Sequence, residues 1–138
     1  MGEGHPDTAT SYNNLGVILR DQGRPAEAEA MHRHALTLRL KALGEAHPDT
    51  AHSYNNLANV LVDQGKLVEA EAMHRRALAI KLKALGAAHP GTAASYNNLA
   101  ATLRDQGKYA EAEAMHRRAL AITVKALGED RPDRKSVV

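Results

Sequence analysis

Histidine is the residue type in this sequence that first suggests metal or acid–base chemistry. Among its 138 residues are eight histidines, six of which form two sets with a constant spacing of 42 residues: His5, His47 and His89, and His32, His74 and His116. Equivalent positions in stacked helical repeats lie about 8–10 Å apart, whereas zinc needs its ligand nitrogens at about 2.1 Å. Histidines one repeat apart therefore cannot share an ion, and we predict neither a metal site nor a cofactor.

Serine recurs at the same spacing, as Ser11, Ser53 and Ser95. A serine nucleophile needs a base within reach, often on a sharp glycine-flanked turn, and the sequence shows no such motif around these serines. Cysteine is absent, and there is no glycine-rich phosphate-binding loop. We therefore expect no catalytic residue and no enzymatic activity.

The charge of the chain does not favour a nucleic-acid partner. Eighteen basic and 16 acidic residues leave a formal charge of +2. Arg75-Arg76 and Arg117-Arg118 form a weak basic band, but glutamates one turn away offset it. Recognition of single-stranded RNA also relies on stacking aromatics, and the chain has four tyrosines with no phenylalanine or tryptophan. We expect no nucleic acid among its partners.

Nothing in the sequence directs the chain to a membrane. It contains no run of 18 apolar residues, and its first residues lack the charged and apolar regions of a signal peptide. Together with the absence of cysteine, these features favour a cytoplasmic protein without a membrane partner.

A 42-residue repeat, present three times, must position the residues considered so far. In the middle copy, Pro48 suits the first turn of a helix, where its missing N–H is not needed. Four apolar residues then follow at i, i+3, i+4 and i+7, the spacing of one helical face: Tyr54, Leu57, Ala58 and Leu61. Gly65 is placed to end this helix.

A second amphipathic helix follows in each copy, with glutamates near its start and lysines near its end, as the helix dipole favours. Its Glu–Arg pairs at i,i+4 predict a solvated face: Glu29–Arg33, Glu71–Arg75 and Glu113–Arg117. We expect Gly44, Gly86 and Gly128 to end these helices. Six helices with short turns and no strand signal predict an all-α fold, a solenoid of stacked helix pairs.

The periodicity divides the chain into three repeats and a remainder. The repeats span residues 2–43, 44–85 and 86–127, and residues 128–138 begin a truncated fourth repeat that runs into a disordered tail. Because the first residues align with an inter-repeat turn, we expect the chain to be a fragment of a longer array. The pattern breaks after Asp130, so residues 130–138 are expected to be mostly disordered.

The repeat resembles the tetratricopeptide repeat, and its length and motifs resemble the 42-residue kinesin-light-chain class. The resemblance covers residues 2–133 and rests on the segments HPDTA, SYNNLA and EAEAMHRRALAI. It implies a right-handed α-solenoid of three helix-turn-helix repeats. In each repeat the first helix (helix A) lines a concave groove and the second (helix B) lies outside. It also implies protein binding rather than catalysis.

His32, His74 and His116 depart from this family pattern, which usually has an aromatic residue at their place in helix B. One interpretation is a part-buried histidine that fills the aromatic position and makes one hydrogen bond. The other is a pH-sensitive stack, in which burial lowers the histidine pKa and stability falls as the pH drops through about 6.5.

One face of helix A changes between the copies. The second and third copies differ at 10 of 42 positions, and three of these differences are spaced 7 and 3 residues apart: His52/Ala94, Asn59/Ala101 and Val62/Arg104. The first copy continues this face, which we name the variable face, with Thr10, Val17 and Arg20. It lies away from the apolar stripe of helix A, and we predict that it contacts a ligand.

An asparagine common to all copies, Asn13, Asn55 or Asn97, lies between the variable positions. Its amide can donate to and accept from a peptide backbone, and in kinesin-light-chain-like arrays the matching asparagine lines the cargo-peptide groove. The predicted peptide-binding residues are Asn13, Val17, Arg20, His52, Asn55, Asn59, Asn97, Ala101 and Arg104. Alternatively, asparagine pairs bond between neighbouring helices, with Asn14, Asn56 and Asn98 as the second members.

Two functions of different classes fit these features. The first is a protein-interaction scaffold that binds an extended peptide segment in the groove. Arg20 and Arg104 favour an acidic ligand, and nearby aspartates dilute that preference. The alternative is a structural array element that forms a homo-oligomer through its uncovered repeat ends, because no complete helix A follows four apolar residues of the last helix: Leu120, Ile122, Val124 and Leu127.

Overall fold

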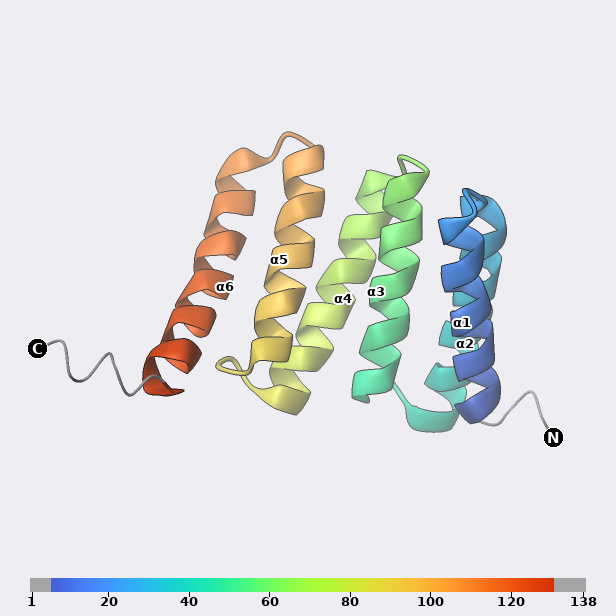
Figure 1. Cartoon of the computed structure of the whole chain (residues 1–138), viewed down its shortest axis with the longest axis horizontal. Coiled ribbons are helices and arrows are strands. Elements are labelled where there is room, and N and C mark those ends of the chain that lie inside the picture. The colour runs from blue at the N-terminus through green and yellow to red at the C-terminus, as the bar shows by residue number, and fades with distance from the viewer. Residues whose placement is uncertain (1–5, 131–138) are drawn as a thin grey trace, which may run out of the picture.

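The structure is a computed structural model that describes residues 6–130. It contains six α-helices: α1 (Pro6–Asp21), α2 (Pro25–Leu43), α3 (Pro48–Asp63), α4 (Leu67–Leu85), α5 (Pro90–Asp105) and α6 (Tyr109–Asp130). The helices form three antiparallel pairs in a row, with α1 and α2 at one end and α6 at the other (Figure 1). Residues 6–130 contain no strand, and the predicted all-α solenoid of three helix-turn-helix repeats is confirmed.

Each A helix after the first begins with the same cap. Pro48 and Pro90 occupy the first turns of α3 and α5. The preceding histidines are the N-cap residues, because His47 Nδ1 accepts from the N–H of Asp49 at 3.0 Å and His89 Nδ1 accepts from that of Gly91 at 2.9 Å. These histidines therefore have a local structural role, which sequence analysis did not identify.

Glycine ends the B helices in the first two repeats but not in the third. Gly44 and Gly86 have φ of +88° and +91°, a conformation that costs glycine little. The prediction for Gly128 is wrong, because α6 continues through it to Asp130.

A threonine explains this difference between the repeats. Thr50 Oγ1 donates to the Gly44 carbonyl at 2.8 Å, and Thr92 Oγ1 donates to that of Gly86 at 2.7 Å. These bonds hold the turn into the next A helix. Arg134 stands at the corresponding place after Gly128 in the sequence. The predicted disordered tail and inter-repeat start fall mainly on residues 131–138 and 1–5, which lie outside the described residues.

The apolar core follows the predicted helical stripe. Tyr54, Leu57, Ala58 and Leu61 of α3 are all buried, and they form one cluster with Ala70, Ala77 and Ile80 of α4. Leu36 of α2 joins this cluster from the preceding repeat, and Leu78 of α4 similarly joins the cluster around α5. Each B helix therefore contributes a leucine to the core of the next repeat, which is how neighbouring repeats are held together.

Polar bonds also cross each junction between repeats, and they correct the prediction of a solvated glutamate face. The predicted Glu–Arg pairs form, but Glu29 also accepts from Gln64 Nε2 at 2.7 Å and from Lys66 Nζ at 3.3 Å. Glu71 repeats this arrangement with Gln106 and Lys108 at 2.8 and 3.1 Å. Both glutamate side chains are only 15% exposed.

The pKa of Glu71 reflects these bonds. Burial alone would raise the pKa of this carboxyl group. Hydrogen bonds from Gln106, Arg75 and Lys108 outweigh burial and lower the pKa to about 2. The glutamate is therefore ionised at neutral pH and joins two repeats.

Replacing Glu71 by glutamine is expected to lower the free energy of unfolding by about 1 kcal/mol at pH 7, because two charge-assisted bonds become neutral ones. Glu113→Gln is the matched control. Within residues 6–130 the Glu113 side chain bonds only to Arg117, and it is 62% exposed. Its replacement should cost less than about 0.3 kcal/mol. Urea unfolding of both variants tests this, and equal losses would contradict it.

Candidate functional site

The variable face lies at the surface of the three A helices. None of its nine positions is buried: Thr10, Val17, Arg20, His52, Asn59, Val62, Ala94, Ala101 and Arg104. Between them, the apolar stripe is buried, as Leu57 and Leu99 show with 0% exposure. The positions that differ between the repeats are thus those where a side chain can contact a partner without disturbing the core.

The asparagine between the variable positions is paired with the unusual histidine of helix B in every repeat. Asn13, Asn55 and Asn97 each present Oδ1 to the ring Nδ1 of His32, His74 and His116, at 2.9 Å in all three cases. An Nδ1–H tautomer of the neutral ring is the donor that fits this arrangement. The prediction of a histidine that fills the aromatic position and makes one hydrogen bond is confirmed for His32 and His74, which are buried.

Burial of these histidines has an electrostatic consequence. It lowers the pKa of His74 to about 4, and that of His32 to the same value, where nearby His52 and Arg20 add to the effect. His116 makes the same bond but is exposed, because no helix within residues 6–130 covers α6 on that side.

Exposure of the predicted asparagines increases along the stack. Asn13 is buried, Asn55 is half-buried and Asn97 is exposed. Asn98 Nδ2 donates to Asn55 Oδ1 at 3.2 Å, so the alternative of asparagine bonding between neighbouring helices is confirmed at this junction. The equivalent Asn56 Nδ2 is buried with no partner among the described residues. Since Oδ1 is engaged by histidine, Nδ2 is the atom best available to a peptide carbonyl.

The arginines of the variable face are not equivalent. Arg20 makes a bidentate pair with Asp63 of the next A helix, with Nη2 3.2 Å from Oδ1. This pair neutralises much of the Arg20 charge, as the nearby aspartates suggested. The Arg104 side chain is 61% exposed, and its one ion pair within residues 6–130 is with Asp105 at 3.9 Å. Arg104 therefore supplies most of the positive charge on this face.

A residue that sequence analysis missed, Arg39 of α2, is buried under the start of the variable face. It donates to the Asp49 carbonyl at 3.1 Å, to Ser53 Oγ at 2.9 Å and to Thr10 Oγ1 at 3.2 Å. Its counterparts are Lys81 and Thr123, so its position gave no sequence signal of a buried cation. The contacts fix α2 against α3 and so help to position His52, whose pKa is lowered by burial and by Arg39 and Lys81.

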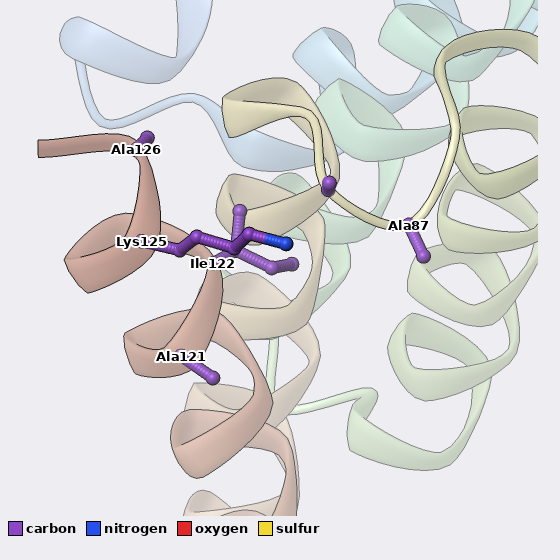
Figure 2. Close-up of a pocket in the computed structure, with 6 residues that line it drawn as sticks. Ala87, Ala121, Ile122, Lys125 and Ala126 are labelled. Carbon is purple, nitrogen blue, oxygen red and sulfur yellow. The ribbon is translucent and has the colours of Figure 1, made fainter. Parts of the chain in front are cut away.

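One hollow in the described part of the chain lies away from the variable face. It measures about 400 Å³ and is lined by Ala87 and Ala88 of the α4–α5 turn and by residues of α6. Figure 2 shows Ile122 and Lys125 in it, with Lys125 as its one charged side chain. A single lysine among alanines provides no acid–base pair. The described residues include no group of three or more His, Cys, Asp or Glu side chains that could hold a metal ion.

No helix within residues 6–130 is both long and apolar enough to cross a membrane.

Comparison with known proteins agrees with the observed repeat. The tetratricopeptide repeat family model matches residues 7–83, 49–125 and 91–135. The crystal structure of BtubC (BKLC) from P. vanneervenii is similar, with a TM-score of 0.85 and 30% identity, over 91% of this chain and 50% of that one. A kinesin-light-chain candidate from Podosopora anserina with nearly identical TPR-like repeats has a TM-score of 0.82 and 28% identity, over 94% of this chain and 62% of that one.

The chain thus spans between half and two-thirds of the length of these two solved structures. A search of curated proteins gives no match. Tetratricopeptide repeats generally mediate protein–protein interactions. Since the family model matches all three copies and the helix pairs stack as a solenoid, this chain belongs to the tetratricopeptide repeat family, and its repeats are of the kinesin-light-chain-like kind.

Proposed function

We propose that this chain is a protein-interaction scaffold that binds an extended peptide segment in the concave groove lined by the A helices. The observation that supports this most is the variable face. Its nine positions are unburied, and they change between repeats whose buried neighbours are nearly identical. Packing holds the buried neighbours constant, whereas the exposed positions can take side chains that suit a partner.

The chemistry of this face suits a peptide. Asn97 is exposed and carries an amide that can donate to a backbone carbonyl. Val17 offers an apolar contact and Arg104 a cation, so that one face combines sequence-independent backbone bonds with side-chain selectivity. The excess positive charge at Arg104 favours an acidic residue in the ligand. We propose a cytoplasmic, non-enzymatic role for a chain with this surface.

A blocking pair tests the groove. Asn59→Glu with Ala101→Glu adds two negatively charged side chains to the variable face of α3 and α5, where they repel an acidic ligand, at positions that are half-buried at most. A peptide selected from a display library against the unmodified chain is expected to bind this double variant at least about ten-fold more weakly, a loss of about 1.4 kcal/mol. Isothermal titration calorimetry or fluorescence anisotropy gives the dissociation constants.

The matched control introduces the same residue type on the B helices. Ala72 and Ala114 are exposed alanines of α4 and α6, and Ala72→Glu with Ala114→Glu should leave peptide affinity unchanged. Circular dichroism should show the same helical signal for both double variants. If the groove variant keeps its affinity and the control loses it, the peptide binds the outer surface and this assignment is wrong.

A further inference from the structure

The two ends of the stack expose residues that are buried inside it. At the α1 end, Leu15 and Ile18 are 45% and 53% exposed, whereas their counterparts Leu57 and Val60 are at 0%. At the α6 end, Leu120 is 61% exposed, while its counterpart Leu78 is at 9%. Figure 1 shows α1 and α6 at opposite ends of the row. We name them the leading end (α1 and the start of α2) and the trailing end (α6).

The apolar parts of these ends match each other. At the two internal junctions a leucine of helix B joins the core of the next repeat: Leu36 shares a cluster with Leu57, and Leu78 shares one with Leu99. Leu120 is the equivalent leucine of α6, and Leu15 is the exposed counterpart of Leu57 and Leu99 in α1. Ile18 lies one turn after Leu15 and is exposed with it. A second copy could therefore place its Leu15 against Leu120 in the way that Leu57 meets Leu36 inside the chain.

The polar parts match as well. Inside the stack, Glu29 and Glu71 bond to a glutamine and a lysine of the following repeat. At the trailing end, Glu113 bonds only to its own Arg117 within residues 6–130. The leading end carries Gln22 and Arg24 where the following repeats have the glutamine and lysine. Arg24 also pairs with Glu27 of its own repeat at 2.6 Å, so Gln22 Nε2 is the donor that the leading end offers most readily to Glu113.

Two more charge pairs agree with this match. Arg33 pairs with Glu69 across the first junction at 2.6 Å, and Arg75 pairs with Glu111 across the second at 3.3 Å. The corresponding residues at the ends are Arg117 and Glu27. The pair between Arg20 and Asp63 has its counterpart in Arg104 at the trailing end and Asp21 at the leading end.

The path of α6 leaves the trailing end open to such a neighbour. After Gly44 and Gly86 the chain turns over the face of the B helix into the next A helix. After Gly128 it continues as helix to Asp130. The part of the chain that the structure describes therefore does not cross the surface formed by Leu120 and Val124.

We propose that copies of this chain stack end to end, with the leading end of one copy seated on the trailing end of the next, so that the solenoid continues across the contact. The partner is a second copy of the chain because its ends repeat both the apolar residues and the charge pairs of the internal junctions. The contact joins two different surfaces, and such heterologous contacts form open chains rather than closed dimers unless the rotation closes a ring. Apart from Arg104, which would pair with Asp21 across the contact, this association uses other residues than those proposed to bind a peptide.

Light scattering with analytical ultracentrifugation of the full chain tests this proposal. The average mass of the 14.9 kDa chain should rise with concentration without stopping at a dimer. Leu120→Glu blocks the trailing end and Ile18→Glu blocks the leading end, and each variant alone should remain monomeric. Mixed in equal amounts they should form a dimer, because each supplies the end that the other lacks. Val68→Glu, at a side chain that is 78% exposed in α4, is the matched control and should associate like the unmodified chain.

A charge exchange provides a second test at exposed side chains, where folding is not at risk. Arg117→Glu alone should raise the dissociation constant by about ten-fold, and adding Glu27→Arg in the same chain should bring it back towards the unmodified value. Glu27→Arg alone also removes the partner of Arg24 within the first repeat, at 2.6 Å, so only the comparison of the double variant with Arg117→Glu measures the contact. The proposal is overturned if the unmodified chain stays monomeric at millimolar concentration. It is overturned equally if Ile18→Glu still self-associates, which would indicate an α6-to-α6 contact, or if the mixed variants do not dimerise.

Discussion

Replacing Leu57 by alanine is expected to lower the free energy of unfolding by about 3 kcal/mol, the largest single effect anticipated here. Leu57 is at 0% exposure and belongs to the cluster that joins α3 to α4 and to Leu36 of the preceding repeat. Truncation removes buried apolar contacts and leaves a cavity among helices that are held on several sides. For a chain of this length the midpoint of thermal unfolding should fall by about 10 °C.

The repeat provides its own control for this change. Leu15 is the same residue at the same place in α1, but no preceding repeat within the described residues covers it, and it is 45% exposed. Leu15→Ala should cost about 1 kcal/mol or less. Urea unfolding and thermal melting of the two variants give the comparison. Similar losses would mean that contacts within one repeat, and not stacking between repeats, determine the stability of this chain.

Acidification from pH 7.5 to pH 5.5 is expected to lower the free energy of unfolding by about 2 kcal/mol. The ordinary histidine pKa is 6.5, and burial lowers that of His32 and His74 to about 4 in the folded chain. Because the unfolded chain takes up these protons first, stability is fully present above about pH 6.5 and is lost as the pH falls towards 4. Each histidine contributes about 1 kcal/mol of this loss at pH 5.5.

Thermal melts at the two pH values measure the effect, and variants assign it. His32→Gln with His74→Gln should abolish most of the difference between the two melts. His116→Gln, which replaces the exposed member of the set, should retain it. The carboxyl of Glu71 does not contribute to the difference between the two melts, because its lowered pKa changes the stability only below about pH 4.5. Coincident melts of the unmodified chain would show that the buried histidines do not control its stability.

The helix pairs and the core could be predicted because they depend on residues close together in sequence. The spacing of Tyr54, Leu57 and Leu61 places them on one side of a helix whatever lies beside it. Pro48 and Gly65 mark the ends of α3 for equally local reasons. Repetition then supplied the arrangement of the pairs, since a face that is apolar in every copy must be covered by the next copy.

Contacts between helices were harder to predict. Sequence analysis assigned separate roles to Asn13 and His32, although the structure joins them with one hydrogen bond. Their constant separation of 19 residues in all three copies was a signal that could have linked them. Burial of Arg39 had no such signal, because it depends on acceptors from two A helices, Thr10 Oγ1 and Ser53 Oγ.

Turns that depend on residues of the next repeat also could not be predicted from the neighbouring residues in sequence. Gly128 follows the same three residues as Gly86, Lys-Ala-Leu, yet remains helical, and Arg134 stands where the earlier repeat has the threonine that holds its turn. For the same reason the glutamates of helix B could be assigned to their own arginines but not to Gln64 or Gln106 of the following repeat.

The buried arginine makes the two junctions between repeats unequal in strength. Arg39 and the Arg20–Asp63 pair both reinforce the joint between the first and second repeats. The joint between the second and third has Lys81 and Val62 at those places. Since a solenoid loses order one neighbour contact at a time, strain applied along the row would be released first at the α4–α5 joint. The first two repeats then behave as one stiff body, and the third as the segment that yields.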